Sequence, residues 1–151
     1  DLIELLKMLR TSFAAQSREK GIDIRIKTDT DSISVHADKD KINQVFINLI
    51  GNAIKFTEKG SIELSAAEKE HHIECSVADT GRGISRENIP KLFNKFQQFG
   101  RGDGPGEKGT GLGLSIVKGI VELHNGNIWV TSREAEGTRF TFTIPKKKQN
   151  A

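Results

Sequence analysis

The sequence is poor in cysteine and in aromatic residues, with one Cys, one Trp and no Tyr among 151 residues. The single thiol, Cys75, cannot close an intramolecular disulfide, and its isolation excludes a cysteine-rich zinc site. The only dense basic run covers residues 146–148. Nucleic-acid-binding faces combine clustered basic side chains with aromatic ones, so we expect no nucleic-acid partner and interpret the lysine run as a solvated tail.

Long apolar runs are also missing. No apolar stretch approaches the roughly 20 residues that cross a bilayer, and no signal peptide opens the chain. We therefore expect a cytoplasmic domain that makes no membrane contact itself. If the parent protein is membrane-anchored, its anchor lies outside this chain.

Glycine is abundant where proline is rare, at 15 residues against 3. This excess predicts several backbone positions that need positive φ or close approach to a ligand. The length and the 35% hydrophobic content fit one folded domain, residues 1–151, which we expect to be a monomer in isolation.

The spacing of apolar residues predicts a mixture of helices and strands. The expected helices cover residues 2–19, a long stretch from 38 to at least 53, residues 85–93 and residues 111–124. The expected strands cover residues 22–26, 32–36, 62–66, 73–77, 128–130 and 140–144. Asp38 is the expected N-cap of the long helix, and Gly21 is expected to end the first helix.

This order of elements does not alternate in the manner of a Rossmann fold, and much of the strand pairing can be made by antiparallel hairpins. We therefore expect an α/β (α+β) two-layer sandwich. Its sheet would be mixed but mainly antiparallel, with helices covering one face.

Asn48, Asn52 and Lys55 lie along one edge of the long helix, since they are spaced four and three residues apart. This edge borders the apolar stripe of the helix. Mg²⁺ prefers oxygen ligands and takes few of them from protein. One Asn oxygen beside a Lys could therefore be enough to bind a Mg-triphosphate. Taken alone, a helix whose polar edge happens to contain Asn explains the same residues.

Asp79 continues the inward-facing positions of its strand. An inward carboxylate is costly unless it meets a donor, and the exocyclic amine of adenine would supply one. Gly81 and Gly83 would let the backbone pass close beneath the base. An Asx turn at the strand end explains the triplet equally well. The triplet also matches the aspartic-protease motif, but that chemistry needs two such carboxylates, and the expected helices do not fit an all-β enzyme.

A glycine run opens the last expected helix, with the sequence Gly109-Thr110-Gly111-Leu112-Gly113-Leu114. Backbone N–H groups at a helix start bind anions, and glycines let phosphate oxygens approach them. The run is neither a dinucleotide fingerprint nor a P-loop. The preceding residues 100–108 are also rich in glycine and are expected to form a lid, with Arg101 and Lys108 available to meet phosphate charge.

Four of these features, taken together, resemble the N, G1, F and G2 boxes of sensor histidine kinases in order and spacing. They are Asn48-x-x-x-Asn52, Asp79-x-Gly81-x-Gly83, Phe93-x-x-Phe96 and the run from Gly109 to Leu114. Residues 44–57 and 123–145 are also similar to that family's helix and closing hairpin. The resemblance covers nearly the whole chain, and it implies the Bergerat (GHKL) fold with ATP and Mg²⁺ as cofactors.

The resemblance also implies roles for individual residues. Asn52 would ligate Mg²⁺, Asn48 would assist it, and Lys55 would contact phosphate. Asp79 would bind the adenine amine, and Phe56 or Ile84 would line the base pocket. The residues of the glycine run would surround the phosphates. Gly137-Thr138 resembles the family's third glycine box.

Two departures from the family pattern bear on function. Many members carry an Arg soon after the F box, whereas this chain has Gln97 and Gln98, with Arg101 further on. The phosphoaccepting His-Glu helix is absent; residues 71–74 follow a strand pattern and are interpreted as a surface turn. The resemblance therefore implies the donor half of a kinase, which transfers the γ-phosphoryl of ATP to a histidine on a separate dimerisation domain and so serves a response regulator indirectly.

Two alternatives keep the fold and change the role. The first is a non-catalytic nucleotide-sensing module, and the second is an anti-sigma-type serine kinase. Residues 1–18 resemble the stretch that follows histidine-kinase dimerisation helices, which favours the histidine-kinase interpretation.

Overall fold

The computed structural model describes residues 1–93, 113–133 and 136–146. Its elements, in chain order, are α1 (Leu2–Ser12), α2 (Ala14–Lys20), β1 (Ile22–Lys27), α3 (Lys39–Phe56), β2 (Gly60–Glu68), β3 (His72–Asp79), the 3-10 helix η1 (Ile89–Lys91), α4 (Gly113–Leu123), β4 (Ile128–Arg133) and β5 (Gly137–Pro145).

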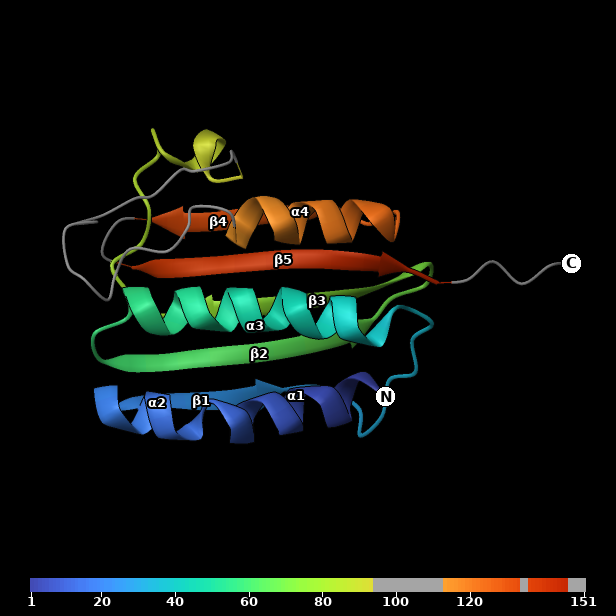
Figure 1. The fold of residues 1–151 in the computed structure, drawn as a ribbon, viewed down its shortest axis with the longest axis horizontal. Coiled ribbons are helices and arrows are strands. Elements are labelled where there is room, and N and C mark those ends of the chain that lie inside the picture. Colours follow the sequence, from blue (N-terminus) through green and yellow to red (C-terminus); the bar gives the residue numbers. More distant parts are fainter. Residues whose placement is uncertain (94–112, 134–135, 147–151) are drawn as a thin grey trace, which may run out of the picture.

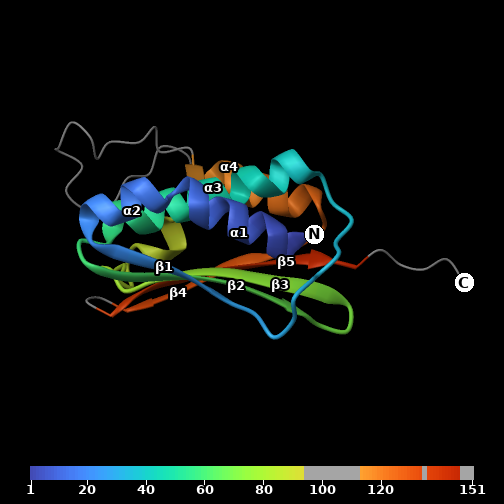
Figure 2. The same cartoon turned by 90° about the horizontal axis from the view of Figure 1, so that it is seen from below.

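The five strands form one sheet in the order β1-β2-β3-β5-β4. The β1–β2 pair is parallel, and the other three pairs are antiparallel. The helices α1 to α4 all lie on the same side of this sheet (Figure 1, Figure 2). The expected two-layer sandwich, with a mixed and mainly antiparallel sheet covered on one face, is confirmed.

The core fills the space between the two layers. The helix-facing residues of the sheet alternate with outward-facing ones, as in β2, where Ile62, Leu64 and Ala66 are buried. Phe46 of α3 meets Phe142 of β5 edge to face, with ring centroids 5.2 Å apart. Burying this apolar surface is the main favourable contribution to folding.

The long helix α3 forms as its sequence predicts. Asp38 is the N-cap, and its carboxylate accepts a hydrogen bond from the Lys41 N–H at 3.1 Å. The buried stripe runs along the whole helix to Ile54, at the end where the predicted Asn and Lys residues lie. The helix ends at Phe56, because Thr57 adopts an extended conformation.

The expected strand over residues 32–36 is wrong. This segment belongs to no helix or strand; instead the Ile33 carbonyl accepts a hydrogen bond from the Leu2 N–H at 2.9 Å. Ile33 is buried, so its apolar character reflects packing beneath the start of α1. The Ile33 carbonyl, which a strand would use for pairing, is therefore engaged by the start of α1.

The first expected helix, residues 2–19, is divided at Phe13 into α1 and α2. The Thr11 hydroxyl donates back to the Lys7 carbonyl at 3.1 Å, a contact that tends to bend helices. Gly21 ends α2 in the left-handed conformation with φ of 71°, as expected from its position.

The expected helix over residues 85–93 is also wrong, since only the short η1 forms there. Its backbone bonds span three residues, as from the Lys91 N–H to the Asn88 carbonyl at 3.0 Å. Pro90 has no N–H and cannot make the four-residue bond that an α-helix needs at this point. The last helix begins at Gly113 within the described residues, and residues 111–112 lie outside them.

The expected turn near residues 71–74 is limited to its first part. His71 lies in the bend between β2 and β3, where the Lys69 N–H donates to the His72 carbonyl at 2.8 Å, and the strand begins at His72. In the part of the chain that the structure describes, no helix is both long and apolar enough to cross a membrane.

Candidate functional site

The predicted site residues gather at one end of the sheet. Asp79 is the last residue of β3, and Thr138, near the start of β5, is its partner across the strand pair. Both lie at the end of the molecule where α3 also finishes (Figure 1). The ladder continues to Ser132 of β4, so Asp79, Thr138 and Ser132 form a polar row on the helix-facing side of three adjacent strands.

Asp79 is half-buried, and its Oδ1 accepts a hydrogen bond from the Gly81 N–H at 2.8 Å. This contact is the Asx turn that the sequence offered as an alternative. Burial raises the pKa of the carboxyl above its ordinary value; hydrogen bonds from the backbone of Gly81 and Thr138 and the nearby Thr57 hydroxyl oppose the rise only in part. The turn and a ligand-facing role are compatible, because a carboxylate accepts several hydrogen bonds at once.

The loop after Asp79 passes tightly beneath the end of α3. A Cβ placed on Gly81 would lie 2.9 Å from both Asp79 Oδ1 and Thr57 Oγ1, and closer still to the Phe56 carbonyl oxygen. Thr57 is fully buried; its hydroxyl is close enough to Asp79 to stabilise the carboxylate charge but forms no hydrogen bond with any described residue. Glycine at position 81 is therefore required by close approach of backbone to backbone.

The edge of α3 carries the predicted cation and phosphate ligands. Asn48, Asn52 and Lys55 are each half-buried along this helix. The Lys55 Nζ lies 5.5 Å from the centroid of the Phe56 ring, and the Arg82 guanidinium lies 4.7 Å from it. Both cations lie within the distance at which the face of an aromatic ring attracts a positive charge.

Ser132 was not predicted from the sequence, yet it joins three segments of the site. Its hydroxyl accepts a hydrogen bond from the Ile84 N–H at 2.8 Å and donates to the Gly137 carbonyl at 2.9 Å. It also lies 2.9 Å from the Thr138 hydroxyl. No local spacing signals this role, because two of the partners come from β5 and the third from the loop after β3.

The remaining predicted residues fall into two groups. Leu114, in the first turn of α4, and Ile84 are partly buried against the core, and Gly113 begins α4. Phe93 of the predicted F box packs edge to face on Phe140 at 6.3 Å. Outside the described residues lie Phe96, Gln97, Gln98, Arg101, Lys108, Gly109, Thr110, Gly111 and Leu112.

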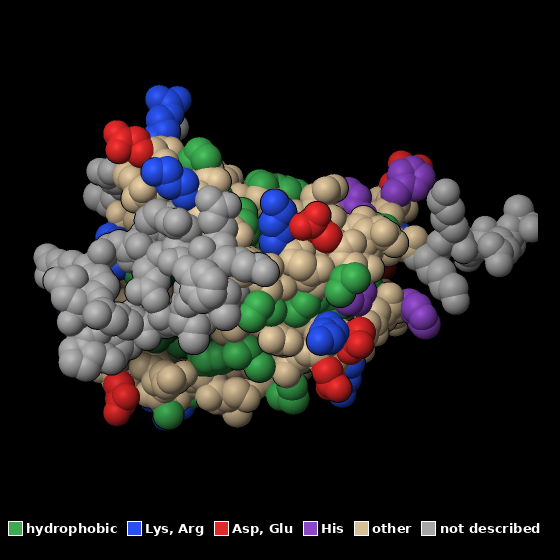
Figure 3. Space-filling view, turned by 45° about the horizontal axis from the view of Figure 1, so that its top comes forward, with side chains coloured by type: hydrophobic (Ala, Val, Ile, Leu, Met, Phe, Trp, Pro, Cys, Tyr) green, Lys and Arg blue, Asp and Glu red, His purple; other side chains and the backbone are tan. Residues whose placement is uncertain are grey.

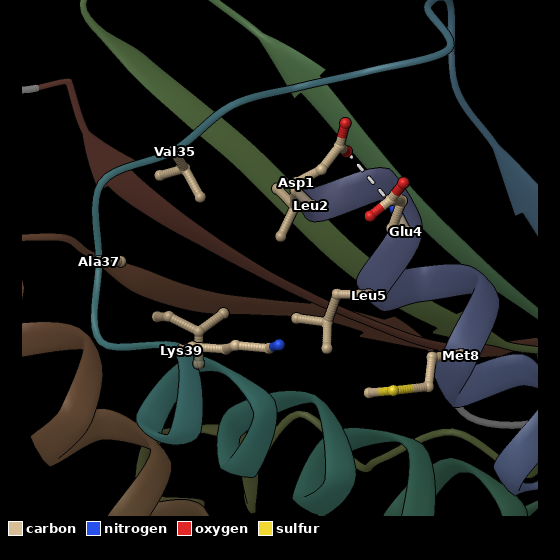
Figure 4. A pocket seen from close by; sticks show the side chains of 9 residues that line it. Asp1, Leu2, Glu4, Leu5, Met8, Val35, Ala37 and Lys39 are labelled. Carbon is tan, nitrogen blue, oxygen red and sulfur yellow. Dashed lines mark hydrogen bonds between the residues drawn. The ribbon is translucent and has the colours of Figure 1, made fainter.

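The described surface also carries a pocket away from this site. The pocket, of about 260 Å³, lies between α1 and the beginning of α3, where Leu5, Met8 and Lys39 line it (Figure 4). It is at the opposite end of α3 from Phe56, about 26 Å along the helix axis. On the face shown in Figure 3, the described acidic and basic side chains are interspersed. Among the residues that the structure describes, no cluster of His, Cys, Asp and Glu could hold a metal ion.

Comparison with known proteins places the chain in a family. Residues 37–148 match the family described as histidine kinase-, DNA gyrase B- and HSP90-like ATPases. The chain belongs to this family. The resemblance to histidine-kinase ATP-binding domains that the sequence motifs indicated is thereby confirmed.

Two relatives that match almost the whole chain are named as sensor histidine kinases. The chain is 37% identical over 149 residues to a sensor-like histidine kinase of Rhizobium meliloti and 34% identical over 151 residues to the sensor histidine kinase WalK of Bacillus subtilis. The alignments cover 98% of this chain in both cases, but only 28% and 24% of the two relatives. The chain therefore spans about a quarter of the length of these proteins.

Solved structures share the whole fold. The catalytic domain of the histidine kinase ThkA superposes with a TM-score of 0.85 at 37% identity, covering 97% of this chain and 95% of that one. Full-length ShkA, crystallised in complex with AMPPNP, superposes with a TM-score of 0.87 at 30% identity, covering all of this chain and 31% of ShkA.

Proposed function

We propose that this chain is a single domain that binds Mg-ATP at the end of the sheet marked by Asp79 and Thr138. The observation that carries the proposal is the half-buried Asp79 carboxylate, which faces the helix layer and is held by the Gly81 N–H beside Phe56. A carboxylate in this position is costly by itself and is compensated when a ligand brings a donor. Membership in this ATPase family supports the amine of adenine as that donor.

The α3 edge suits the phosphate end of the same ligand. Asn52 would supply an amide oxygen to Mg²⁺, with Asn48 assisting and Lys55 meeting a phosphate. Amide oxygens are among the hard ligands that Mg²⁺ accepts, and the ion keeps water and phosphate oxygens for its other positions. When bound, the ion neutralises phosphate charge. Gly113 and Leu114 begin a helix whose N-terminus favours anions.

The proposed reaction is transfer of the ATP γ-phosphoryl group to a histidine of a separate dimerisation domain, which would then serve a response regulator. The relatives are named sensor histidine kinases, and a complex of ThkA with the response regulator TrrA superposes with a TM-score of 0.81 at 34% identity, covering 97% of this chain and 41% of ThkA. The contribution of this domain would be to position the phosphates and neutralise their charge.

Titration with a fluorescent ATP analogue, with and without Mg²⁺, tests the binding step. We expect Asn52→Ala to weaken binding only when Mg²⁺ is present, and Asp79→Asn to weaken it in both conditions. Asn127→Ala, an exposed Asn at the opposite end of β4, is the matched control and should bind like the parent. Parent-like binding by both site variants would rule the proposal out.

The non-catalytic alternative has one sequence feature in its favour, because Gln97 and Gln98 stand where many family members carry an Arg. Radiolabelled phosphotransfer to a separately produced dimerisation domain distinguishes the two functions. Labelled histidine is expected for a kinase, whereas nucleotide binding without any transfer would identify a sensing module. Acid-stable phosphoserine on a partner would instead indicate the serine-kinase alternative.

A further inference from the structure

We propose that Ser132 is a specificity-determining positioning residue, which turns the Thr138 hydroxyl into an obligate hydrogen-bond acceptor and so makes the base end of the site select a 6-aminopurine. The inference rests on the proposed nucleotide function and adds a residue to it. It follows from counting the hydrogens in the polar row of Asp79, Thr138 and Ser132.

Three polar groups surround the Ser132 oxygen. The Ile84 N–H donates to it at 2.8 Å, the Gly137 carbonyl lies 2.9 Å away, and the Thr138 hydroxyl oxygen lies 2.9 Å away. A serine hydroxyl has one hydrogen to donate and two lone pairs to accept with. One lone pair is used by Ile84.

The hydrogen of Ser132 is directed by its carbonyl neighbour. A carbonyl can only accept, so the 2.9 Å contact with Gly137 is favourable only if Ser132 donates to it. The second lone pair of Ser132 then accepts the hydroxyl hydrogen of Thr138. The opposite assignment would leave the Ser132 and Gly137 oxygens in contact with no hydrogen between them, in a region where Thr138 is only 7% exposed.

This arrangement leaves Thr138 with no hydrogen for a ligand. Thr138 can therefore only accept a hydrogen bond from a ligand. The ionised carboxylate of Asp79, which lies opposite Thr138 on β3, can likewise only accept. Two neighbouring acceptors favour a group that brings hydrogens, directly or through one water. The amine at position 6 of adenine brings two, whereas the oxygen at position 6 of guanine brings none.

Ser132 has a further effect on the same wall of the site. Because it holds the Ile84 N–H, it ties the loop after Asp79 to the β4–β5 pair. Loss of this hydrogen bond alone would lower the binding affinity for every nucleotide by the same factor. Loss of control over the Thr138 hydroxyl, by contrast, would change the ratio of the affinities for different nucleotides. The two effects of Ser132 can therefore be measured separately.

The test compares dissociation constants for ATP, GTP and purine riboside 5′-triphosphate, measured by calorimetry. In Ser132→Ala the Thr138 hydroxyl is free to rotate and donate. We expect the preference for ATP over GTP to fall roughly fivefold, a change typical of one neutral hydrogen bond, because Thr138 can then donate to the guanine oxygen. The preference for ATP over purine riboside triphosphate should change less, since the freed Thr138 hydroxyl can still accept from the adenine amine.

Three variants complete the design. Ser132→Thr keeps the hydroxyl and should keep both ratios. Thr131→Ala removes a hydroxyl from the exposed face of the same strand and should also keep them. Thr138→Val removes the acceptor and should lower the ATP preference over purine riboside triphosphate roughly fivefold. In this background Ser132→Ala should change the ratio of ATP to GTP affinity no further. Thr138→Val keeps the inference testable if Ser132→Ala does not fold.

The possible outcomes differ in what they overturn. An equal loss of affinity for all three nucleotides in Ser132→Ala would overturn the inference, because Ser132 would then only support the loop. Unchanged ratios in Thr138→Val would overturn it too. A parent chain that binds no nucleotide would overturn the proposed function itself, and with it the inference.

Discussion

The Nε2 atom of His124, at the end of α4, accepts a hydrogen bond at 3.2 Å from the backbone N–H of Asp38, the N-cap residue of α3. The other ring nitrogen, Nδ1, lies 2.9 Å from the Ile120 carbonyl, which can only accept. These two contacts fit the tautomer that carries its hydrogen on Nδ1. One side chain thus connects the two helices that flank the proposed phosphate site.

Removal of this connection should lower stability. We expect His124→Ala to reduce the free energy of unfolding by about 1–2 kcal/mol, since two hydrogen bonds are lost at a partly buried position. Urea denaturation followed by circular dichroism measures this change. His36→Ala alters an exposed histidine and should leave stability within about 0.5 kcal/mol of the parent. Equal values for the two variants would show that the His124 contact contributes nothing.

Asp79 should reduce the stability of the ligand-free domain. Because burial raises the pKa of its carboxyl in the folded state, the ionised form disfavours folding at pH values above that pKa. The cost is lost as the pH falls through the folded pKa towards the unfolded value of about 3.9, where the carboxyl is protonated in both states. Asp79→Asn should therefore unfold at a higher temperature than the parent at neutral pH.

The difference in melting temperature between Asp79→Asn and the parent should shrink as the pH is lowered to about 4. Calorimetric scans at a series of pH values give this difference directly, and comparison within each pH cancels the titration of other groups. A variant that melts below the parent at neutral pH would contradict the interpretation. The same variant should lose nucleotide affinity, so stability and binding would move in opposite directions.

Gly81 should tolerate no side chain. Gly81→Ala would place a methyl group against the Phe56 carbonyl, Asp79 and Thr57, and we expect it to cost about 1–3 kcal/mol and to weaken nucleotide binding. Gly119→Ala is the matched control, because this helical glycine has open space around its Cβ position. The control should raise the free energy of unfolding by about 0.5–1 kcal/mol. Chemical denaturation of both variants checks the opposite signs.

Much of the fold was predictable because local signals and tertiary packing agreed. The stripe from Ile42 to Ala53 and the N-cap Asp38 both indicate a helix, and burial on one face maintains it. Residues 32–36 show the limit of such signals, since Ile33 is apolar for packing beneath α1 and not for strand pairing. The expected helix over residues 85–93 failed for a different reason. Pro90 has no N–H, and this outweighed the helical spacing of its neighbours.

The arrangement of the candidate site was predictable where its residues lie close together in the sequence. Strand alternation placed Asp79 on the inner face, and helical spacing placed Asn48 and Asn52 on one edge of α3. Ser132 and Thr57 could not be found in this way. The partners of Ser132 come from β5 and the loop after β3, and Thr57 approaches Gly81 only in the folded chain. An isolated Ser or Thr also has too many ordinary roles for its sequence position to distinguish one.

The end of α3 depends on a residue from another helix. The Lys20 Nζ, at the end of α2, donates to the Ile54 carbonyl at 2.7 Å and reaches the Lys55 carbonyl at 3.4 Å. These carbonyls are among the last of α3, which the helix itself leaves without partners, and a cation there also complements the helix dipole. Lys20 therefore fixes the turn that carries Lys55 and Phe56.

Lys20→Met keeps most of the aliphatic stem and removes the charge and the hydrogen bonds. We expect it to lower the free energy of unfolding by about 1 kcal/mol and to increase hydrogen exchange in the last turn of α3. Lys39→Met, at the first turn of the same helix, removes a cation from the end where the dipole disfavours it and should not destabilise the domain. Faster exchange confined to the end of α3 in Lys20→Met, with weaker binding of ATP, would link this cap to the nucleotide site; unchanged exchange there would show that the helix end is held by its core contacts alone.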